Sequence, residues 1–209
     1  MLLKGLSLLF LGIGIFVLMQ VVLPFASFKM MEISAFEDSS TLVDPTDVES
    51  SIAIENVGDF PAFVVKGASS ARLPYKEFKL SIPSLSIDQL KVMSYSNDFE
   101  KNLAQLPGSA FPGEKGNVFI TGHSSLETVL GGSKYAFFAP LPNIKKGESI
   151  VIDALGQRFT YEVESIKIVS PKDTSVINPP DGRGRYLTLM TCVPPGFNTK
   201  RLIVFAKLK

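Results

Sequence analysis

The chain has 209 residues, and its 21 Lys and Arg residues nearly balance its 20 Asp and Glu residues, which gives a net charge of +1 at pH 7. This balance argues against a nucleic-acid-binding protein, because such proteins carry a basic excess or a basic stripe. The single Cys and the single His exclude an intramolecular disulfide, a multi-cysteine metal site and metal centres that need two or three histidines.

Residues 5–28 form the longest stretch without a formal charge. As a helix at about 1.5 Å per residue they would span about 36 Å, enough to cross a bilayer core of about 30 Å. The stretch is longer than a signal-peptide core of about 7–15 residues, and residues 24–27 (P-F-A-S) offer no clean small-x-small cleavage site. The sequence therefore predicts an N-terminal membrane anchor over residues 1–28, with a cleaved signal or a buried helix as the alternatives.

An acidic and Ser-rich segment follows the anchor over residues 29–75. Lys4 and Lys29 flank the apolar stretch and set the orientation only weakly, and we expect the amino terminus inside and the following domain outside. We interpret the segment as a linker or stalk. Residues 46–49 (T-D-V-E) fit a capping box, so a short helix over about 47–55 is an alternative for part of it.

Residues 76–209 read as one domain of short apolar runs separated by Pro and Gly. The runs that predict strands are 78–82, 117–121, 149–152, 158–169, 186–191 and 202–205, and those at 98–106 and 125–130 favour short helices. Strands at this spacing indicate an all-β barrel or sandwich. No strand–helix–strand alternation or glycine-rich phosphate loop is present, which excludes nucleotide-binding α/β folds.

The residues that can carry chemistry stand at the ends of predicted strands. His123 follows one strand, Cys192 ends another, and Arg201 opens the last. If the strands on either side of residues 193–200 pair as antiparallel neighbours, Cys192 and Arg201 lie at the same end of the sheet. A thiolate nucleophile, an imidazolium acid and a guanidinium beside the developing oxyanion are sufficient for acyl transfer from an amide. By residue type alone, a buried apolar Cys and a surface His and Arg are the commoner interpretation.

Three motifs resemble those of sortases, the membrane-anchored cysteine transpeptidases of bacterial surfaces. Residues 188–192 (T-L-M-T-C) match the family's T-L-x-T-C motif, residues 116–123 (G-N-V-F-I-T-G-H) resemble its G-N-x-x-x-x-G-H segment, and residues 201–204 (R-L-I-V) match its R-L-x-V strand. The motifs come in the family's order, and the similarity extends over residues 78–207.

The resemblance implies a sortase-like eight-stranded β-barrel with short helices, preceded by the N-terminal transmembrane helix. It implies cleavage of an LPxTG-like sorting signal, with Cys192 as nucleophile, His123 as acid and base, and Arg201 as the group that stabilises the oxyanion. It also assigns Thr121, Thr191 and Asn198 to substrate binding. The implied partners are a surface-protein substrate and an amine acceptor, from a peptidoglycan cross-bridge or a pilin lysine, and the implied location is the bacterial cell membrane with an extracellular catalytic domain.

No cofactor or metal is expected, because Asp173 and Asp181 are too few and too generic to predict a calcium site. Protonation limits the reaction. With ordinary pKa values of about 8.5 for the thiol and about 6.5 for the imidazole, the thiolate–imidazolium pair is only about 1% of the protein at pH 7. Slow turnover is expected unless the site shifts these values.

The subclass stays open. Residues 191–201 (T-C-V-P-P-G-F-N-T-K-R) resemble the T-C-x-P-x-G-x-N-x-x-R run of pilin-polymerising class C sortases. Asp44-Pro45 is followed by Thr46 rather than by the aromatic residue of the class C lid, and the chain stops at Lys209 without a second apolar helix. These departures make a housekeeping or class D/E-like anchoring role at least as good an interpretation. The alternatives to a transpeptidase are a non-catalytic sortase-like module that binds peptides and a thiol peptidase that transfers only to water.

Overall fold

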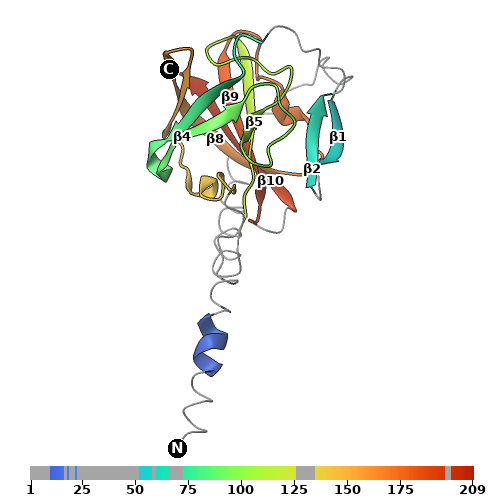
Figure 1. Ribbon diagram of the computed structural model, residues 1–209, viewed down its shortest axis with the longest axis vertical. Coiled ribbons are helices and arrows are strands. Elements are labelled where there is room, and N and C mark those ends of the chain that lie inside the picture. The colour runs from blue at the N-terminus through green and yellow to red at the C-terminus, as the bar shows by residue number, and fades with distance from the viewer. Residues whose placement is uncertain are drawn as a thin grey trace, which may run out of the picture.

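A closed β-barrel forms the main body of the protein (Figure 1). The structure, a computed structural model, describes residues 10–16, 18, 22, 52–57, 60–65, 73–125, 135–195 and 199–209. The barrel has eight strands in the order β10-β8-β7-β3-β4-β5-β6-β9, and β9 pairs with β10 to close it. The predicted all-β, eight-stranded barrel is therefore confirmed.

Most neighbouring strands of the barrel run antiparallel, whereas β4–β5 and β6–β9 are parallel pairs. The bounds are β3 Glu77–Ile82, β4 Ile87–Met93, β5 Leu103–Gln105, β6 Gly116–Thr121, β7 Ser149–Ala154, β8 Gln157–Val169, β9 Arg185–Val193 and β10 Lys200–Leu208. Short 3-10 helices follow β3, precede β7 and follow β8, at η1 Pro83–Leu85, η2 Leu141–Asn143 and η3 Ser175–Ile177. The strands β1 Ile52–Val57 and β2 Phe60–Val65 form a separate antiparallel pair.

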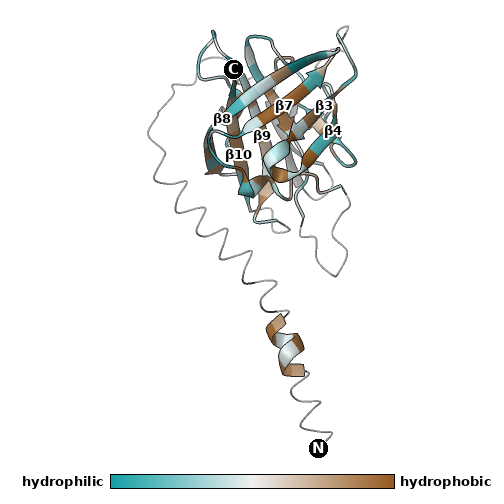
Figure 2. Cartoon of the chain, turned by 90° about the vertical axis from the view of Figure 1, so that its left-hand side faces the viewer, coloured by the Kyte–Doolittle hydropathy of each residue, from teal (hydrophilic) through white to brown (hydrophobic). Residues whose placement is uncertain are grey.

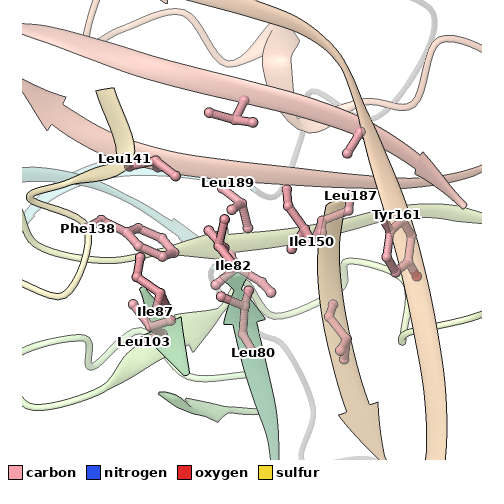
Figure 3. Close-up of a cluster of buried hydrophobic side chains, with 14 of the residues drawn as sticks. Leu80, Ile82, Ile87, Leu103, Phe138, Leu141, Ile150, Tyr161, Leu187 and Leu189 are labelled. Atoms are coloured by element: carbon pink, nitrogen blue, oxygen red, sulfur yellow. The ribbon is translucent and has the colours of Figure 1, made fainter. Parts of the chain in front are cut away.

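The interior of the barrel is filled by alternate side chains of its strands, because successive residues of a strand point to opposite faces. The sequence of β3 (E-F-K-L-S-I) shows this alternation of polar and apolar residues, and Figure 2 colours the strand accordingly. The buried interior cluster includes Leu80, Ile82, Leu103, Phe138, Leu141, Ile150, Tyr161, Leu187 and Leu189, which point toward one another in Figure 3. On β9 these interior positions are odd-numbered, so the even-numbered side chains of that strand face outward.

A second, smaller core lies on the outer face of β6, β9 and β10. Phe119, Met190 and Ile203 come from these strands and pack with Leu106 and with Ile177 of η3. The loop between β8 and β9, residues 170–184, therefore covers the outside of the barrel here. Because both faces of β9 are covered, residues 186–191 are all buried, which explains the near-continuous apolar run in the sequence.

Asn117 ties this loop to the barrel wall. Its Nδ2 donates a hydrogen bond to the carbonyl of Ile177 at 2.9 Å, and its Oδ1 accepts one from the hydroxyl of Thr188 at 3.0 Å. Asn117 and Thr188 are buried, so water cannot replace either partner. This side chain fixes where η3 sits on β6 and β9.

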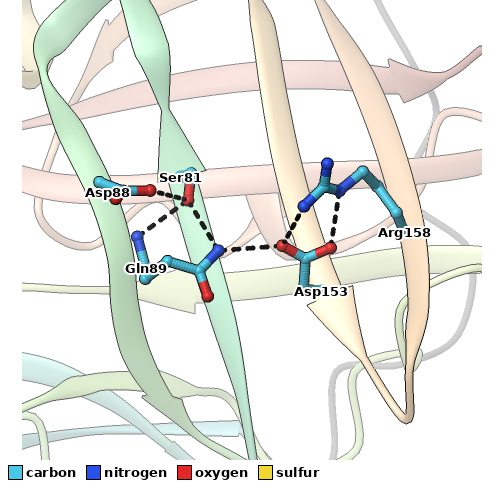
Figure 4. A network of polar contacts seen from close by, with 5 residues as sticks. All are labelled: Ser81, Asp88, Gln89, Asp153 and Arg158. Carbon is cyan, nitrogen blue, oxygen red and sulfur yellow. Dashed lines mark hydrogen bonds and ion pairs between the residues drawn. The ribbon is translucent and has the colours of Figure 1, made fainter.

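A chain of polar contacts crosses β3, β4, β7 and β8 on the exposed surface (Figure 4). The Ser81 hydroxyl donates to Asp88 Oδ1 at 3.2 Å and accepts from the backbone N–H of Gln89 at 2.9 Å. Gln89 Nε2 reaches Asp153 Oδ2 at 3.0 Å, and Arg158 pairs with Asp153 and holds the pKa of that carboxyl below its usual value. Exposed ion pairs contribute little to stability. We therefore infer that these polar contacts mainly align the strands where the β3–β4 register shifts.

Two helical expectations are wrong. Residues 98–106 hold a turn region and the strand β5 instead of a helix. The Ser96 hydroxyl accepts from the Asp98 N–H and the Asp98 carboxylate accepts from the Glu100 N–H, and such local bonds compete with a helix. The short helix considered over residues 47–55 is also wrong where the structure describes it, because Ile52–Val57 is a strand. The helix expected at 125–130 lies almost wholly outside the described residues.

The predicted membrane anchor falls largely outside the described residues. Residues 10–16 are helical, and their apolar side chains are half or more exposed, for example Phe10 at 64% and Leu11 at 60%. Within the part of the chain that the structure describes, no helix is both long enough and apolar enough to cross a membrane.

Replacing Asn117 by Leu is expected to destabilise the barrel by about 2–6 kcal/mol, because the Ile177 carbonyl and the Thr188 hydroxyl both lose a buried partner, at about 1–3 kcal/mol each. Thr188→Val leaves only the Asn117 Oδ1 unpartnered and should cost less. Urea denaturation of both variants measures the free energy of unfolding. Equal losses in the two variants would contradict the double role of Asn117.

Candidate active site

Cys192 of β9, Arg201 of β10 and His123, two residues beyond the end of β6, lie in one row. Cys192 of β9 and Arg201 of β10 are direct cross-strand partners. The side chains of such a pair share one face of the sheet, with Cβ atoms about 4.5–5.5 Å apart. The expectation that these two residues lie at the same end of the sheet is therefore confirmed.

His123 reaches the row from the other side of β9. The parallel β6–β9 register pairs Thr121 with Met190, so two further residues along each chain bring His123 beside Cys192. The Gly122 N–H donates to the Met190 carbonyl at 3.2 Å, which shows that the two chains stay together past the end of β6. The sequence separates these residues widely, and the strand order β6-β9-β10 brings them together.

The row continues the outer face that carries the second core. Phe119, Met190 and Ile203 occupy that face. Cys192 is two residues from Met190 on β9, and Arg201 is two residues from Ile203 on β10, so both side chains lie on the same face. The β8–β9 loop, seated on this core, thus borders the site. Asp181 holds the far end of the loop: it accepts from Gly184 N–H at 2.7 Å and from the Tyr186 hydroxyl at 2.7 Å.

Burial decides the charge state of the thiol. Desolvation raises the pKa of Cys192, and the positive charge of Arg201 offsets this only in part. The Arg201 side chain is itself buried, at 2% exposure, and its Nη1 donates to the Lys200 carbonyl at 3.1 Å. A fixed guanidinium beside the thiol is placed to stabilise negative charge that develops there.

The imidazole is shifted in the opposite direction. Burial lowers the pKa of His123, and the negative charge of Glu100 opposes this shift. The Phe99 ring covers the imidazole, with ring centroids 4.8 Å apart and an angle of 54° between the planes. A raised thiol pKa and a lowered imidazole pKa both favour the neutral pair. The thiolate–imidazolium fraction is therefore smaller than the about 1% that ordinary pKa values give.

The remaining sequence-predicted substrate residues lie in different environments. Thr121 ends β6 on the same outer face as Cys192 and is half-buried. Thr191 lies on the interior face of β9, is buried, and donates from its hydroxyl to the Gly122 carbonyl at 2.8 Å. Asn198 lies outside the described residues. The substrate-binding role of each stays a prediction.

Sequence reasoning gave no role in the site to Phe99, Glu100 or Ser124, and it noted Phe138 only in a flanking segment that resembles the family. Phe99 and Glu100 surround His123 from the β4–β5 connection, and the Phe138 N–H donates to the His123 carbonyl at 3.0 Å. The Ser124 hydroxyl donates to the carbonyl of Cys192. Phe99 and Glu100 belong to no recognisable motif, whereas the position of Ser124 directly after His123 was a signal that could have been used.

Metal binding finds no support in the described residues, where no group of three or more His, Cys, Asp and Glu side chains lies close enough to hold an ion. Asp173 instead accepts a hydrogen bond from Ser175 within the loop, and Asp181 accepts one from Tyr186 at the start of β9.

Comparison with protein families and sequences points to one group. A model of the Sortase domain matches residues 80–209, more than half of the chain. Sortase A of Bacillus anthracis is 32% identical over 135 residues, which cover 62% of this chain and 58% of that protein. Sortase D of Bacillus subtilis is 30% identical over 115 residues, covering 54% and 52%. The chain thus spans a little over half the length of each of these relatives.

Similar solved structures are also sortases. The lid mutant of sortase A from Corynebacterium diphtheriae aligns with a TM-score of 0.57 and 27% identity, over 89% of this chain and 95% of that one. The sortase D5 transpeptidase of Clostridium perfringens aligns with a TM-score of 0.54 and 27% identity, over 64% and 79%.

The Cys192 thiol is expected to titrate above its ordinary value of about 8.5, because its burial outweighs the effect of Arg201. The rate of alkylation by iodoacetamide against pH measures this, and the chain has a single Cys, so the signal has one source. Arg201→Met should raise the midpoint further, since the charge that favours the thiolate is lost. The same titration in denaturant is the control, and a folded midpoint at or below the denatured one would contradict the expectation.

Proposed function

This chain belongs to the sortase family, and we propose that it is a cysteine transpeptidase that cleaves an LPxTG-like sorting signal and transfers the acyl group to an amine. The observation that carries the proposal is the row formed by His123 just beyond β6, Cys192 on β9 and Arg201 on β10. The row supplies a nucleophile on β9, with an acid–base group on one side of that strand and a fixed positive charge on the other. Its members are the residues that match the family's motifs.

The first half of the proposed reaction forms a thioester. The Cys192 thiolate attacks the Thr carbonyl carbon of the Thr–Gly bond, and the Arg201 guanidinium stabilises the negative charge on the carbonyl oxygen. As the C–N bond breaks, the His123 imidazolium gives its proton to the departing amine. The products are an acyl-thioester on Cys192, a neutral His123 imidazole and the released fragment, which now has the glycine at its amino terminus.

The second half returns the site to its starting state. An incoming amine attacks the thioester carbonyl, and the neutral His123 takes the proton that the amine loses. The C–S bond breaks and leaves the Cys192 thiolate beside Arg201. Because the imidazole is mostly neutral at pH 7, the base that this step needs is the abundant form, whereas the acid needed in the first half is scarce.

The β8–β9 loop is the part of the site that we propose to read the sorting signal. It lies against the outer face of the barrel, held by Asn117 near η3 and by Asp181 before β9. A loop fixed at both places offers a defined edge beside Cys192 for an extended peptide. The acceptor amine, a peptidoglycan cross-bridge or a pilin lysine, and the class C-like or class D/E-like subclass are open within this proposal.

We propose residues 1–28 as a membrane anchor, 29–75 as a linker that includes the β1–β2 pair, and 76–209 as the extracellular catalytic domain of a bacterial single-pass protein. The charge-free stretch over residues 5–28 supports the anchor, as do the exposed apolar side chains of residues 10–16. Side chains such as Phe10 and Phe16 bury apolar area only if something other than this domain covers them.

Transpeptidation is tested by mass spectrometry of the full chain in detergent, incubated with LPxTG-like peptides and a glycine-type amine. We expect an acyl adduct on Cys192 and an amine-ligated product, both absent from Cys192→Ala. Hydrolysis that added amine does not divert would indicate a peptidase instead. Absence of any adduct across a varied peptide set would contradict catalysis and favour the alternative, a non-catalytic peptide-binding module.

Membrane anchoring is tested by expressing the full chain in bacteria and washing the membranes with alkaline carbonate. The full chain should stay in the pellet at its full mass, and a chain lacking residues 1–28 should be released. The truncated chain lacks the apolar side chains whose burial in lipid contributes about 0.8 kcal/mol of binding free energy for each CH2. A product shortened near residue 27 would support the cleaved-signal alternative. Release of the intact full chain would contradict the anchor.

A further inference from the structure

Two hydroxyl groups link the His123 segment to the Cys192 strand in a reciprocal way. The Thr191 hydroxyl donates to the Gly122 carbonyl at 2.8 Å, and the Ser124 hydroxyl donates to the Cys192 carbonyl. Each residue next to a reacting side chain thus binds the opposite segment. We propose that Ser124 is a positioning residue of the active site, which together with Thr191 holds the His123 imidazole at a fixed distance from the Cys192 sulfur. This inference rests on the proposed function.

The inference begins with the place where the β6 ladder ends. β6 stops at Thr121, so His123 lies beyond the last paired residue of that strand. The Gly122 N–H still bonds to the Met190 carbonyl. After it, the backbone bond from the Phe138 N–H to the His123 carbonyl ties the segment to a loop and not to β9. Ser124, the residue after His123, then bonds through its hydroxyl to the Cys192 carbonyl and so ties the segment to β9.

The surroundings make these bonds effective. Ser124 is 6% exposed and Thr191 is 2% exposed, so water competes poorly for either hydroxyl. The segment also cannot move into the barrel, because a Cβ at Gly122 would overlap Leu103 and Phe138 side chains. The two hydroxyl bonds therefore oppose movement along β9 and away from it, and the packed wall opposes movement inward.

Fixed geometry matters here for a chemical reason. His123 must give a proton to the leaving amine and later take one from the incoming amine, both bound to a carbon attached to the Cys192 sulfur. A misplacement of about 1 Å at such a site costs up to about 100-fold in rate. Removing the Ser124 hydroxyl should therefore act on the chemical steps and leave the binding of the peptide, by the loop and the outer face, largely unchanged.

The test compares Ser124→Ala with Ser109→Ala in the full chain. Ser109 is a matched control: it is equally buried, at 8% exposure, and its hydroxyl also donates to a backbone carbonyl, that of Leu106 at 2.7 Å. Ser124→Ala should lower kcat about tenfold or more and change KM by less than about twofold. Ser109→Ala should leave both constants near those of the unchanged chain, and Ser124→Thr should restore kcat.

A second measurement needs no substrate. The chain has one His, so the NMR titration of its imidazole reports His123 alone. Burial lowers the pKa of His123, and a loosened segment admits water, so Ser124→Ala should move this pKa up toward about 6.5. Ser109→Ala should leave it in place.

The outcomes separate the two proposals. If the unchanged chain transfers no acyl group but Ser124→Ala still moves the His123 titration, the proposed function fails and the positioning role stands. If Ser124→Ala matches Ser109→Ala in kcat and in the titration, the positioning role is overturned, whatever the unchanged chain does. If Ser124→Ala does not fold, Thr191→Val replaces it: a lowered kcat with a raised His123 pKa supports the inference, and normal values overturn it.

Discussion

The register between β6, β9 and β10 is the constraint on which the site depends. Cys192 faces Arg201 because these residues are cross-strand partners, and His123 arrives beside Cys192 because the β6–β9 pairing is in register as far as Thr121. A slip of one residue would turn a side chain of the row to the barrel interior. Apolar packing on both faces of β9 prevents such a slip, since each face has a buried cluster that fits one register only.

Covering both faces has an electrostatic consequence. The burial that fixes the register also removes water from the thiol and the imidazole, which raises the pKa of Cys192 and lowers that of His123. Both groups rest in their neutral forms, and the reactive ion pair is a minor state. In the exported location that we propose, this is also protective, because the thiolate is the form that oxidants attack.

The sequence predicted those strands whose pattern is local. The runs at 149–152 and 158–169, which form β7 and β8, and the runs of β9 and β10 are strongly apolar. The short connection between Cys192 and Arg201 was enough to predict that β9 and β10 pair. β5 was missed because it has three residues and owes its conformation to β4 and β6. The roles of Phe99 and Ser124 were missed because they depend on contacts between segments far apart in the chain, Phe99 with His123 and Ser124 with Cys192.

Side chains of β9 point alternately into the barrel and toward its outer face, and the two sets have different roles. Leu187, Leu189 and Val193 point inward and hold the barrel together, whereas Met190 and Cys192 point outward to the loop and the site. Thr191 is the exception that joins the two layers: it is an interior residue by position, yet its hydroxyl reaches the backbone beside His123. A polar residue in an otherwise apolar interior row is expensive unless its hydroxyl is bonded. Its presence is therefore explained by the bond it makes, and the interior of the barrel takes a direct part in setting the geometry of the outer face.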